Sequence, residues 1–477
     1  MYDRMGLFID GAWRAKAAEM LPVVDPATGE QIGAAPSATV ADTEAAIASA
    51  ERGLKAWRGT QAWARADILH KVADMMLVRA EEAAKRITLE AGKPLAQSRR
   101  EWQLSIDQFR WHAEEARRIY GRVVESRVPG GRLEVSHEPI GIVAAFTAWN
   151  FPAVLIARKA APALAAGCSI IIRPSRETPG VAMVLADCLR EAGVPAGVVN
   201  LVTGPTSTTY APIMASPKVR KVSLTGSTAV GQQMIRDAAA TLKRCTMELG
   251  GNAPVIVFDD FDVEAALDIC VPVKFANAGQ VCVTGDRFYV QQEVYGKFVA
   301  GFAARAKALK LGHGLEDTTQ MGPLINQKRI DAIEAVVADA RKAGGTINAG
   351  GGRPAGQNKG FFFEPTVISN IPDSAKALAE ENFGPIAAIT SFKSADEAYA
   401  RANSSDMGLS AYVFTRDPKR QREAVARIES GMVGVNSFAL AAAEAPFGGI
   451  KASGTGREGG TEAIHDYMNV KLAQIVL

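Results

Sequence analysis

Residues 141–172 read GIVAAFTAWNFPAVLIARKAAPALAAGCSIII, and this stretch decides the fold class. The runs Ile142–Phe146 and 169–172 are short, apolar and rich in isoleucine and alanine, as buried strands of a parallel sheet are. Between them, Val154–Ala166 has the length and composition of a helix, and Gly167 follows where a helix commonly ends. Two further strand-like runs continue this rhythm, at 199–202 and 222–224. The alternation predicts a parallel, doubly wound α/β sheet, which binds nucleotides at the carboxyl ends of its strands.

The chain is long enough for more than one hydrophobic core. It has 477 residues, whereas single cores stop growing at about 250–300 residues. The strand rhythm restarts after Asn252, so we expect a second α/β domain to begin near residue 250. Before the first sheet, apolar spacing predicts three helices, at 42–56, 63–89 and 95–120. Two alternating runs around a Pro-Gly-Gly turn predict a hairpin over 122–137, either an arm for a neighbouring subunit or a simple cover.

Composition narrows the class of protein. The formal net charge is only +3 and Lys and Arg are scattered, so no basic patch indicates a nucleic-acid or membrane partner. No apolar run reaches the roughly 18 residues of a membrane span, and residues 1–5 lack a signal-peptide pattern. The five cysteines are odd in number and irregularly spaced, which argues against disulfides and a zinc site. We therefore expect a cytoplasmic protein without a metal.

Two glycine-containing segments are candidates for phosphate binding. The segment GTGREG at 454–459 matches a dinucleotide fingerprint by letter, but it follows no clear strand and opens no βαβ unit, so we reject it. The segment with Gly226, Ser227 and Gly231 follows a strand and precedes a helix, whose free N–H groups suit a pyrophosphate. Taken alone, this second segment fits an ordinary capped glycine turn better.

Four other segments place chemically useful side chains beside turns. They are WNFP at 149–152, MELGGN at 247–252, FANAGQVC at 275–282 and ENFGP at 381–385. Together with APFGGIK at 445–451 and SGTGRE at 453–458, they resemble the aldehyde dehydrogenase superfamily in order and spacing over nearly the whole chain. The resemblance implies a Rossmann-like cofactor domain, a second α/β catalytic domain and a small β oligomerisation element. We expect these parts at 1–121 with 138–248, at 249–448, and at 122–137 with 461–477, in a homodimer or homotetramer.

The resemblance also implies a mechanism. Cys282 is the nucleophile, which forms a thiohemiacetal with the aldehyde and then a thioester. A thiolate is the reactive form and free cysteine has a pKa of about 8.5, so this thiol needs a base or a favourable field. The Asn150 side chain and the Cys282 backbone N–H stabilise the oxyanion. Glu248 is the general base that activates water, and Lys159 helps to relay protons.

For the cofactor, the resemblance implies NAD or NADP, with Glu381 holding the nicotinamide ribose. Most relatives have lysine, which binds the adenosine ribose, where this chain has Arg173. NAD-specific relatives commonly have glutamate at the position of Arg176, and an arginine binds phosphate oxygens instead, which favours NADP or tolerance of both cofactors. Alternatively, Arg176 points to solvent and Glu177 takes over. The full expected cofactor set is Thr147, Ala148, Trp149, Arg173, Ser175, Arg176, Gly226, Ser227, Gly231, Leu249, Glu381 and Phe383.

The substrate is the least constrained expectation. Arg158 has the spacing from Asn150 seen in succinate-semialdehyde dehydrogenases, where an arginine reads the distal carboxylate. We expect it on a helix that starts at Asn150, eight residues earlier, so that it shares a wall with the chemistry. The second arginine of such enzymes is Ala276 here, and the second cysteine that some carry is Thr284. The substrate is thus either a semialdehyde held by Arg158 or a larger, less charged aldehyde, such as an aromatic one. A salt bridge of Arg158 to an internal carboxylate is a further alternative.

Other activities are weaker interpretations. Release of the thioester to coenzyme A is disfavoured because acylating relatives typically lack the glutamate that Glu248 matches. A cysteine hydrolase is disfavoured because no histidine lies in a recognisable triad context. A non-enzymatic structural member of the superfamily would be free to lose Cys282, Glu248 or Asn150, and all three are present.

Overall fold

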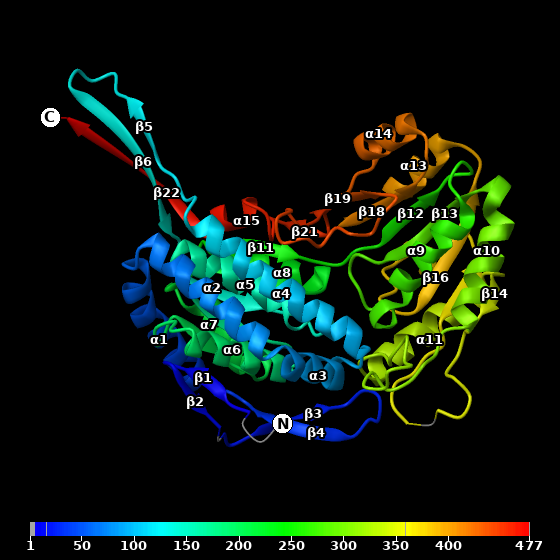
Figure 1. The fold of residues 1–477 in the computed structure, drawn as a ribbon, viewed down its shortest axis with the longest axis horizontal. Coiled ribbons are helices and arrows are strands. Elements are labelled where there is room, and N and C mark those ends of the chain that lie inside the picture. The colour runs from blue at the N-terminus through cyan, green and yellow to red at the C-terminus, as the bar shows by residue number, and fades with distance from the viewer. Residues whose placement is uncertain (1–4, 16, 358, 477) are drawn as a thin grey trace.

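The computed structural model describes residues 5–15, 17–357 and 359–476. Two α/β units lie side by side, and a narrow three-stranded arm projects from the first of them (Figure 1). Residues 1–4, on which most of the signal-peptide expectation rests, lie outside the described residues, as does Leu477 at the end of the expected oligomerisation element.

The first unit is built on an eight-stranded sheet with the order β2-β1-β9-β8-β7-β10-β11-β21. Its strands β7 to β11 run parallel, as predicted, and the order reverses between β7 and β10. Such a reversal opens a crevice at the carboxyl ends of the two strands, where ligands of doubly wound sheets bind. The bounds are β1 Leu7–Ile9, β2 Ala12–Arg14, β7 Ile142–Phe146, β8 Ser169–Arg173, β9 Val199–Leu201, β10 Val219–Thr225, β11 Arg244–Glu248 and β21 Gly454–Thr455.

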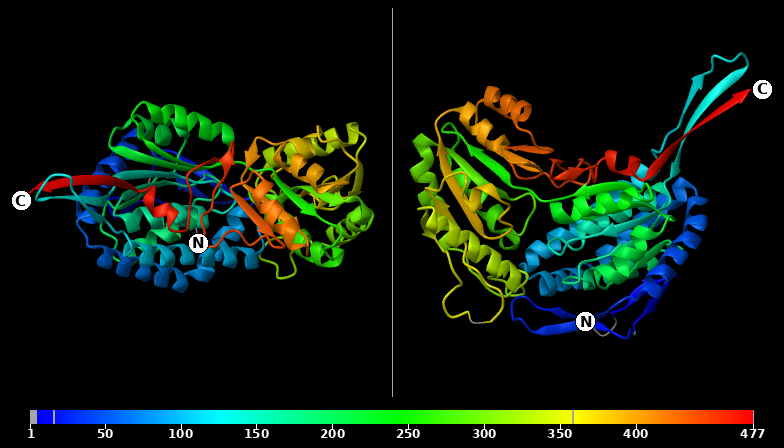
Figure 2. Two further views of the ribbon diagram at one scale, coloured as in Figure 1. Left: turned by 90° about the horizontal axis from the view of Figure 1, so that it is seen from above. Right: turned by 180° about the vertical axis from the view of Figure 1, so that it is seen from behind.

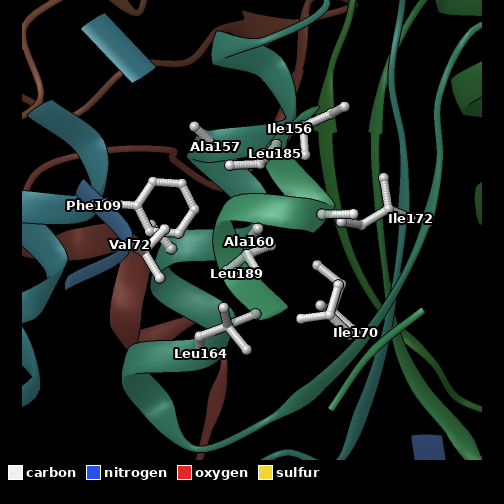
Figure 3. Close-up of a cluster of buried hydrophobic side chains, with 14 of the residues drawn as sticks. Val72, Phe109, Ile156, Ala157, Ala160, Leu164, Ile170, Ile172, Leu185 and Leu189 are labelled. Carbon is white, nitrogen blue, oxygen red and sulfur yellow. The ribbon is translucent and has the colours of Figure 1, made fainter. Parts of the chain in front are cut away.

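Helices cover both faces of this sheet. Alternate residues of β7 face opposite sides, so Val143 joins a core with α2, α4, α5 and α6, whereas Ile142 joins a core with α1, α7 and α8. Figure 3 shows the first of these cores, in which Phe109, Leu164 and Ile170 gather from α4, α5 and β8. The bounds are α1 Val40–Arg58, α2 Ala62–Val78, α3 Ala80–Ala91, α4 Leu95–Ala116, α5 Val154–Ala166, α6 Gly180–Glu191, α7 Thr206–Ala215 and α8 Thr228–Ala239.

The prediction of three helices between residues 42 and 120 was wrong, because the structure has four there, α1 to α4. The expected helix at 63–89 is broken at Arg79, whose φ of −98° and ψ of 14° end α2 and begin α3. Apolar residues keep a helical spacing across the break because both helices face one core, and no Gly or Pro marks it. The structure also adds an unpredicted hairpin of β3 (Met20–Val24) and β4 (Gln31–Pro36).

The second unit is a seven-stranded sheet with the order β14-β15-β16-β13-β12-β18-β19. Its first strand along the chain is β12, which directly follows Asn252. Helices α9 to α12 cover one face, and α13 and α14 cover the other. The bounds are β12 Ala253–Val257, β13 Gly285–Gln291, β14 Thr346–Ala349, β15 Thr366–Ser369, β16 Ile386–Phe392, β18 Ser410–Phe414, β19 Met432–Val435, α9 Val263–Phe275, α10 Gln292–Lys307, α11 Gln327–Lys342, α12 Lys376–Ala379, α13 Ala395–Asn403 and α14 Pro418–Arg427.

The carboxyl-terminal segment returns from the second unit to the first. A short pair joins β17 (Met407–Gly408) to β20 (Ile450–Lys451), and β21 then lies antiparallel to β11. The rejected glycine motif at 454–459 therefore contains β21 and opens no βαβ unit. The short helix α15 (Glu462–His465) leads on to the arm.

The arm consists of β5 (Arg122–Glu125), β6 (Gly131–Pro139) and β22 (Met468–Val476), all antiparallel. The predicted hairpin is present, and the last strand of the chain pairs with its second strand from Met468 to Val476. Both views in Figure 2 show the arm standing away from the two units. No helix in the described part of the chain is long and apolar enough to cross a bilayer.

Candidate active site

An open cleft of about 430 Å³ lies where the two units face each other, at the carboxyl ends of β7 and β10. The first unit contributes the segments that follow these strands, and the second contributes the Cys282 turn, the start of α11 and the loop before β16. The lining residues are Ala148, Trp149, Asn150, Glu177, Thr225, Gly226, Ser227, Leu249, Gly250, Cys282, Asn326, Lys328, Arg329, Glu381 and Phe383.

Cys282 lies in the turn between α9 and β13. After α9 the chain forms one 3₁₀ turn, η1 (Ala276–Gly279), in which Asn277 and Ala278 have positive φ angles of 48° and 52°. Gly279 follows at φ 71°, and a Cβ there would lie 2.0 Å from the carbonyl oxygen of Gly384. Only glycine permits this approach, so the turn that carries Cys282 rests directly on the loop after Glu381.

The thiol of Cys282 is held in its neutral form. Burial, and then the carboxyl groups of Glu381 and Glu248, raise its pKa to about 12, and the Arg158 charge opposes this shift. The reaction therefore needs a base or a bound cationic group to produce the thiolate.

Asn150 lies in the link between β7 and α5, and its side chain is buried. Its Nδ2 donates to the carbonyl oxygen of Gln280 at 3.1 Å, two residues before Cys282. An amide nitrogen carries two hydrogens, so one remains for another acceptor. The helix after Asn150 begins at Val154 and not at Asn150 itself, which corrects our expectation, because the intervening residues form the turn that brings the amide to Gln280.

Glu248 ends β11 and is buried, and neither carboxyl oxygen has a hydrogen-bond partner in the described structure. Burial, and then the nearby Glu458 carboxyl, raises the pKa of Glu248 well above its ordinary value, while Lys159 and Arg158 oppose the shift. A carboxyl group in this state is a stronger base near neutral pH than an ordinary glutamate.

Lys159 lies on α5 and forms a fully buried ion pair with Glu458. Its Nζ also donates to the hydroxyl of Thr225 at 2.7 Å, at the edge of the cleft. The sequence assigned no role to Glu458 beyond its place in the motif at 453–458. It lies 299 residues from Lys159 in the chain, so local spacing could not predict this ion pair.

The wide part of the cleft is bounded by rings and turn residues. The indole of Trp149 meets the Phe383 ring edge to face, with centroids 5.5 Å apart. Ser227 is the N-cap of α8, but its side chain makes no capping hydrogen bond and is free to bind a ligand. Gly231 lets α8 approach Leu249, because a Cβ there would lie 2.4 Å from a Leu249 methyl carbon.

Five of the expected cofactor residues do not line the cleft, namely Thr147, Arg173, Ser175, Arg176 and Gly231. The Arg173 guanidinium donates to the hydroxyl of Thr209 at 3.2 Å and to the carbonyl oxygen of Gly204 at 3.0 Å. The Arg176 side chain is exposed, whereas Glu177 lines the cleft and accepts a hydrogen bond from Ser175. This arrangement matches the alternative in which Arg176 points to solvent.

Arg158 is buried on α5 and is not in an ion pair with any described carboxylate. Nη2 donates to the carbonyl oxygen of Ala441 at 3.3 Å, and the guanidinium carbon lies 4.3 Å from the Phe447 ring centroid. Nη1 has no hydrogen-bond partner within the described residues. Burial lowers the pKa of Arg158, and Glu458, Glu248 and Cys282 raise it, which places these groups near the guanidinium.

The aldehyde dehydrogenase family model matches residues 13–473. The chain belongs to the aldehyde dehydrogenase family. It is 42% identical to the NADP⁺-dependent succinate-semialdehyde dehydrogenase GabD of Escherichia coli, over 98% of this chain and 97% of that protein. It is 43% identical to a 3-sulfolactaldehyde dehydrogenase of Pseudomonas putida, over 97% and 95%. A crystal structure of an E. coli NADP-dependent enzyme superposes with a TM-score of 0.97 at 41% identity, covering 99% of this chain and 98% of that one.

This aldehyde dehydrogenase is therefore an enzyme that oxidises aldehydes with NAD or NADP. Family membership decides against a cysteine hydrolase. Five residues of the cleft were not among the expected site residues. Thr225 and Gly250 adjoin expected ones, whereas Asn326, Lys328 and Arg329 do not. They lie at the start of α11 and match no short motif, and Arg329 donates to the carbonyl oxygens of Asn382 and Phe383 at 2.6 and 3.0 Å.

Proposed function

We propose that the enzyme oxidises a semialdehyde to a dicarboxylic acid, with the aldehyde at Cys282 and the distal carboxylate at Arg158. The observation that carries this proposal is the buried Nη1 of Arg158, which has no partner among the described residues. A buried guanidinium is costly unless it is paired, so a carboxylate substrate is its natural partner. The curated relatives named above, and a glutarate-semialdehyde dehydrogenase of Pseudomonas aeruginosa at 41% identity, are named for aldehydes that carry an anionic group.

The chemistry at Cys282 divides into acylation and hydrolysis. The thiolate adds to the aldehyde carbon, and the Asn150 amide and the Cys282 backbone N–H donate to the oxyanion. The bound nicotinamide cofactor supplies the acceptor for the hydride that leaves this carbon, and a thioester remains on Cys282. Glu248 removes a proton from water, whose oxygen attacks the thioester and releases the acid and the Cys282 thiolate. The Lys159–Glu458 pair carries the released proton away from Glu248.

The residues present fit a dinucleotide. The hydroxyl of Ser227 is free at the positive end of the 12-residue helix α8, where a pyrophosphate is stabilised. The buried hydroxyl of Thr147 also has no partner in the described chain. Glu381 faces the cleft from the second unit and would accept from ribose hydroxyls, while Trp149 and Phe383 bound the nicotinamide side. The turn at Gly226, the Ala148 backbone and Leu249 complete this wall.

Both cofactors are used in this proposal. Glu177 faces the cleft and would accept from a ribose 2′-hydroxyl. The exposed Arg176 is free to turn toward a 2′-phosphate. Hydrogen bonds of Arg173 to Gly204 and of Ser175 to Glu177 hold the segment that carries both side chains. The retained arginine favours NADP, and the adjacent carboxylate keeps NAD binding.

Assays with both cofactors and a panel of aldehydes test the substrate assignment. Four- and five-carbon semialdehydes should have higher kcat/KM values than uncharged aldehydes of equal length. The alternative is an aromatic or other less charged aldehyde, which the Phe447 ring beside Arg158 favours. A consistent preference for benzaldehyde-like or long aliphatic aldehydes would establish that alternative and make Arg158 structural.

Residues 1–121 and 138–248, which contain every strand of the first sheet except β21, form the cofactor domain in this proposal, and 249–448 form the catalytic domain. The arm at 122–137 and 461–477 mediates a homodimer or homotetramer, because it exposes Val123, Val470 and Leu472 with no cover in the described chain. Light scattering in solution measures the mass of the assembly, and removal of residues 468–477 should lower it.

All five cysteines are free, which supports a cytoplasmic location.

A further inference from the structure

A buried polar network lies behind Asn150, on the side away from the cleft. Lys93 and Glu101 form an ion pair at 2.6 Å, and both side chains are 1% exposed. Lys93 Nζ also donates to the backbone carbonyl oxygen of Asn150 at 2.6 Å, and it lies 4.0 Å from the Phe151 ring centroid. A fully buried ammonium is thus fixed against the residue that carries the proposed oxyanion donor.

Glu101 binds the end of the β7–α5 link, next to α5. Its Oε1 accepts from the backbone N–H groups of Ala153 and Val154, at 2.8 and 3.4 Å, where α5 begins. A carboxylate at a helix N-terminus is favourable, so Glu101 fixes the start of α5 while Lys93 fixes the peptide of Asn150.

Asn277 joins this network to the turn that carries the nucleophile. Its Nδ2 donates to the carbonyl oxygen of Asn150 at 3.1 Å and to that of Gln280 at 3.3 Å. Gln280 in turn accepts from Asn150 Nδ2 at 3.1 Å, which closes a ring of hydrogen bonds. The carbonyl oxygen of Asn150 therefore has two donors, and the charged one is Lys93.

We propose that Lys93, neutralised by Glu101, is a positioning residue that aims the Asn150 amide at the oxyanion beside Cys282. The inference rests on the proposed role of Asn150. Rotation of the Asn150 peptide would turn its side chain, and the ammonium prevents that rotation with a charge-assisted hydrogen bond. A misplacement of about 1 Å in such a site costs up to roughly 10²-fold in rate.

The test compares two reactions of one thiol. Oxidation of an aldehyde needs the oxyanion donor, whereas alkylation of Cys282 by iodoacetamide does not. Lys93→Met should slow the pre-steady-state burst of reduced cofactor at least about tenfold, while the alkylation rate stays within about twofold. Lys93→Arg should restore most of the burst. Because loss of one partner leaves a buried charge unpaired, Lys93→Met/Glu101→Leu is the second variant, and it decides the question where the single variant does not fold.

A double-mutant comparison separates this inference from the assignment of Asn150. Lys93→Met should cause no further slowing of the burst when added to Asn150→Ala. If Asn150→Ala alone leaves the burst unchanged, the oxyanion assignment fails. If Asn150→Ala slows the burst and the Lys93 variants do not, or if they slow alkylation equally, the positioning role of Lys93 is wrong. Lys221→Met is the matched control, because Lys221 is also buried but its Nζ donates to Thr246 and lies over the Tyr467 ring, with no hydrogen bond to Asn150 or Asn277 among the described residues.

Discussion

The carboxylate of Glu381 accepts a hydrogen bond from the backbone N–H of Gly251 at 2.9 Å, and this bond joins the loop before β16 to the link between the two sheets. Burial raises the pKa of Glu381 to about 7, and the Gly251 N–H opposes the shift. The group that is proposed to hold the nicotinamide ribose therefore changes its charge near neutral pH.

Cofactor binding should weaken as pH falls through 7. Glu381 is ionised above its pKa and accepts from ribose hydroxyls, and protonation below it removes this acceptor. We expect the Kd for the oxidised cofactor, measured by fluorescence titration, to rise between pH 8 and pH 6. Glu381→Gln should bind more weakly at pH 8 and show little pH dependence. An equal pH slope in the glutamine variant would assign the titration to another group.

Cys282→Ala should abolish dehydrogenase activity while cofactor binding persists. Since the pKa of the thiol is about 12 in the free protein, the thiolate fraction should grow about tenfold per pH unit between pH 7 and 10. Iodoacetamide labelling followed by mass spectrometry measures this slope at Cys282. Cys245→Ala, which removes the other cysteine that is not fully buried, is the control and should keep full activity. A labelling rate that is flat above pH 7 would mean that the thiol is already ionised.

Glu248→Gln should separate acylation from hydrolysis. General base catalysis contributes about 10²–10⁴-fold, so steady-state turnover should fall by this factor while a burst of reduced cofactor survives. Mass spectrometry should then detect the acyl group on Cys282. In the unmodified enzyme, kcat should rise with pH through the raised pKa of Glu248, and the variant should lack this limb. Normal turnover in the variant would mean that a different group activates the water.

Arg158→Ala should raise KM for succinate semialdehyde more than it lowers kcat. Charge-assisted hydrogen bonds contribute about 1.5–3 kcal/mol, so we expect a rise of roughly tenfold or more. Butanal, which has the same chain length without the carboxylate, is the control substrate. In the variant, its kcat/KM should be about equal to that of succinate semialdehyde. An equal fall in kcat/KM for both substrates would show that Arg158 supports the fold through Ala441 and Phe447.

Arg176 and Glu177 should act on cofactor choice in opposite directions. Arg176→Glu should weaken NADP about tenfold or more relative to NAD, because it replaces a phosphate-binding group with a repelling one. Glu177→Gln should strengthen NADP relative to NAD. Ratios of kcat/KM for the two cofactors measure both effects. Unchanged ratios in both variants would show that neither side chain reads the ribose.

Local signals in the sequence located the parts of the fold that have strong boundaries. The end of α5 at Ala166 was predicted to the residue, because Gly167 takes a left-handed φ of 91° that ends the helix. The break at Arg79 was missed because nothing local distinguishes that residue from the helices on either side. Lys328 and Arg329 were missed for a different reason, since they reach the cleft only when α11 of the second unit faces the first sheet.

Gly279 packs directly against the carbonyl oxygen of Gly384, so the turn that carries Cys282 and the loop that carries Glu381 move together. The turn that carries the nucleophile cannot shift without displacing the loop of Glu381 and Phe383, and the reverse is equally true. Opening the cleft to release a cofactor therefore has to occur on the side of the first sheet, or by moving the second unit as a whole. The Cys282 thiol and the Glu381 carboxylate then keep the same relative position through every catalytic cycle.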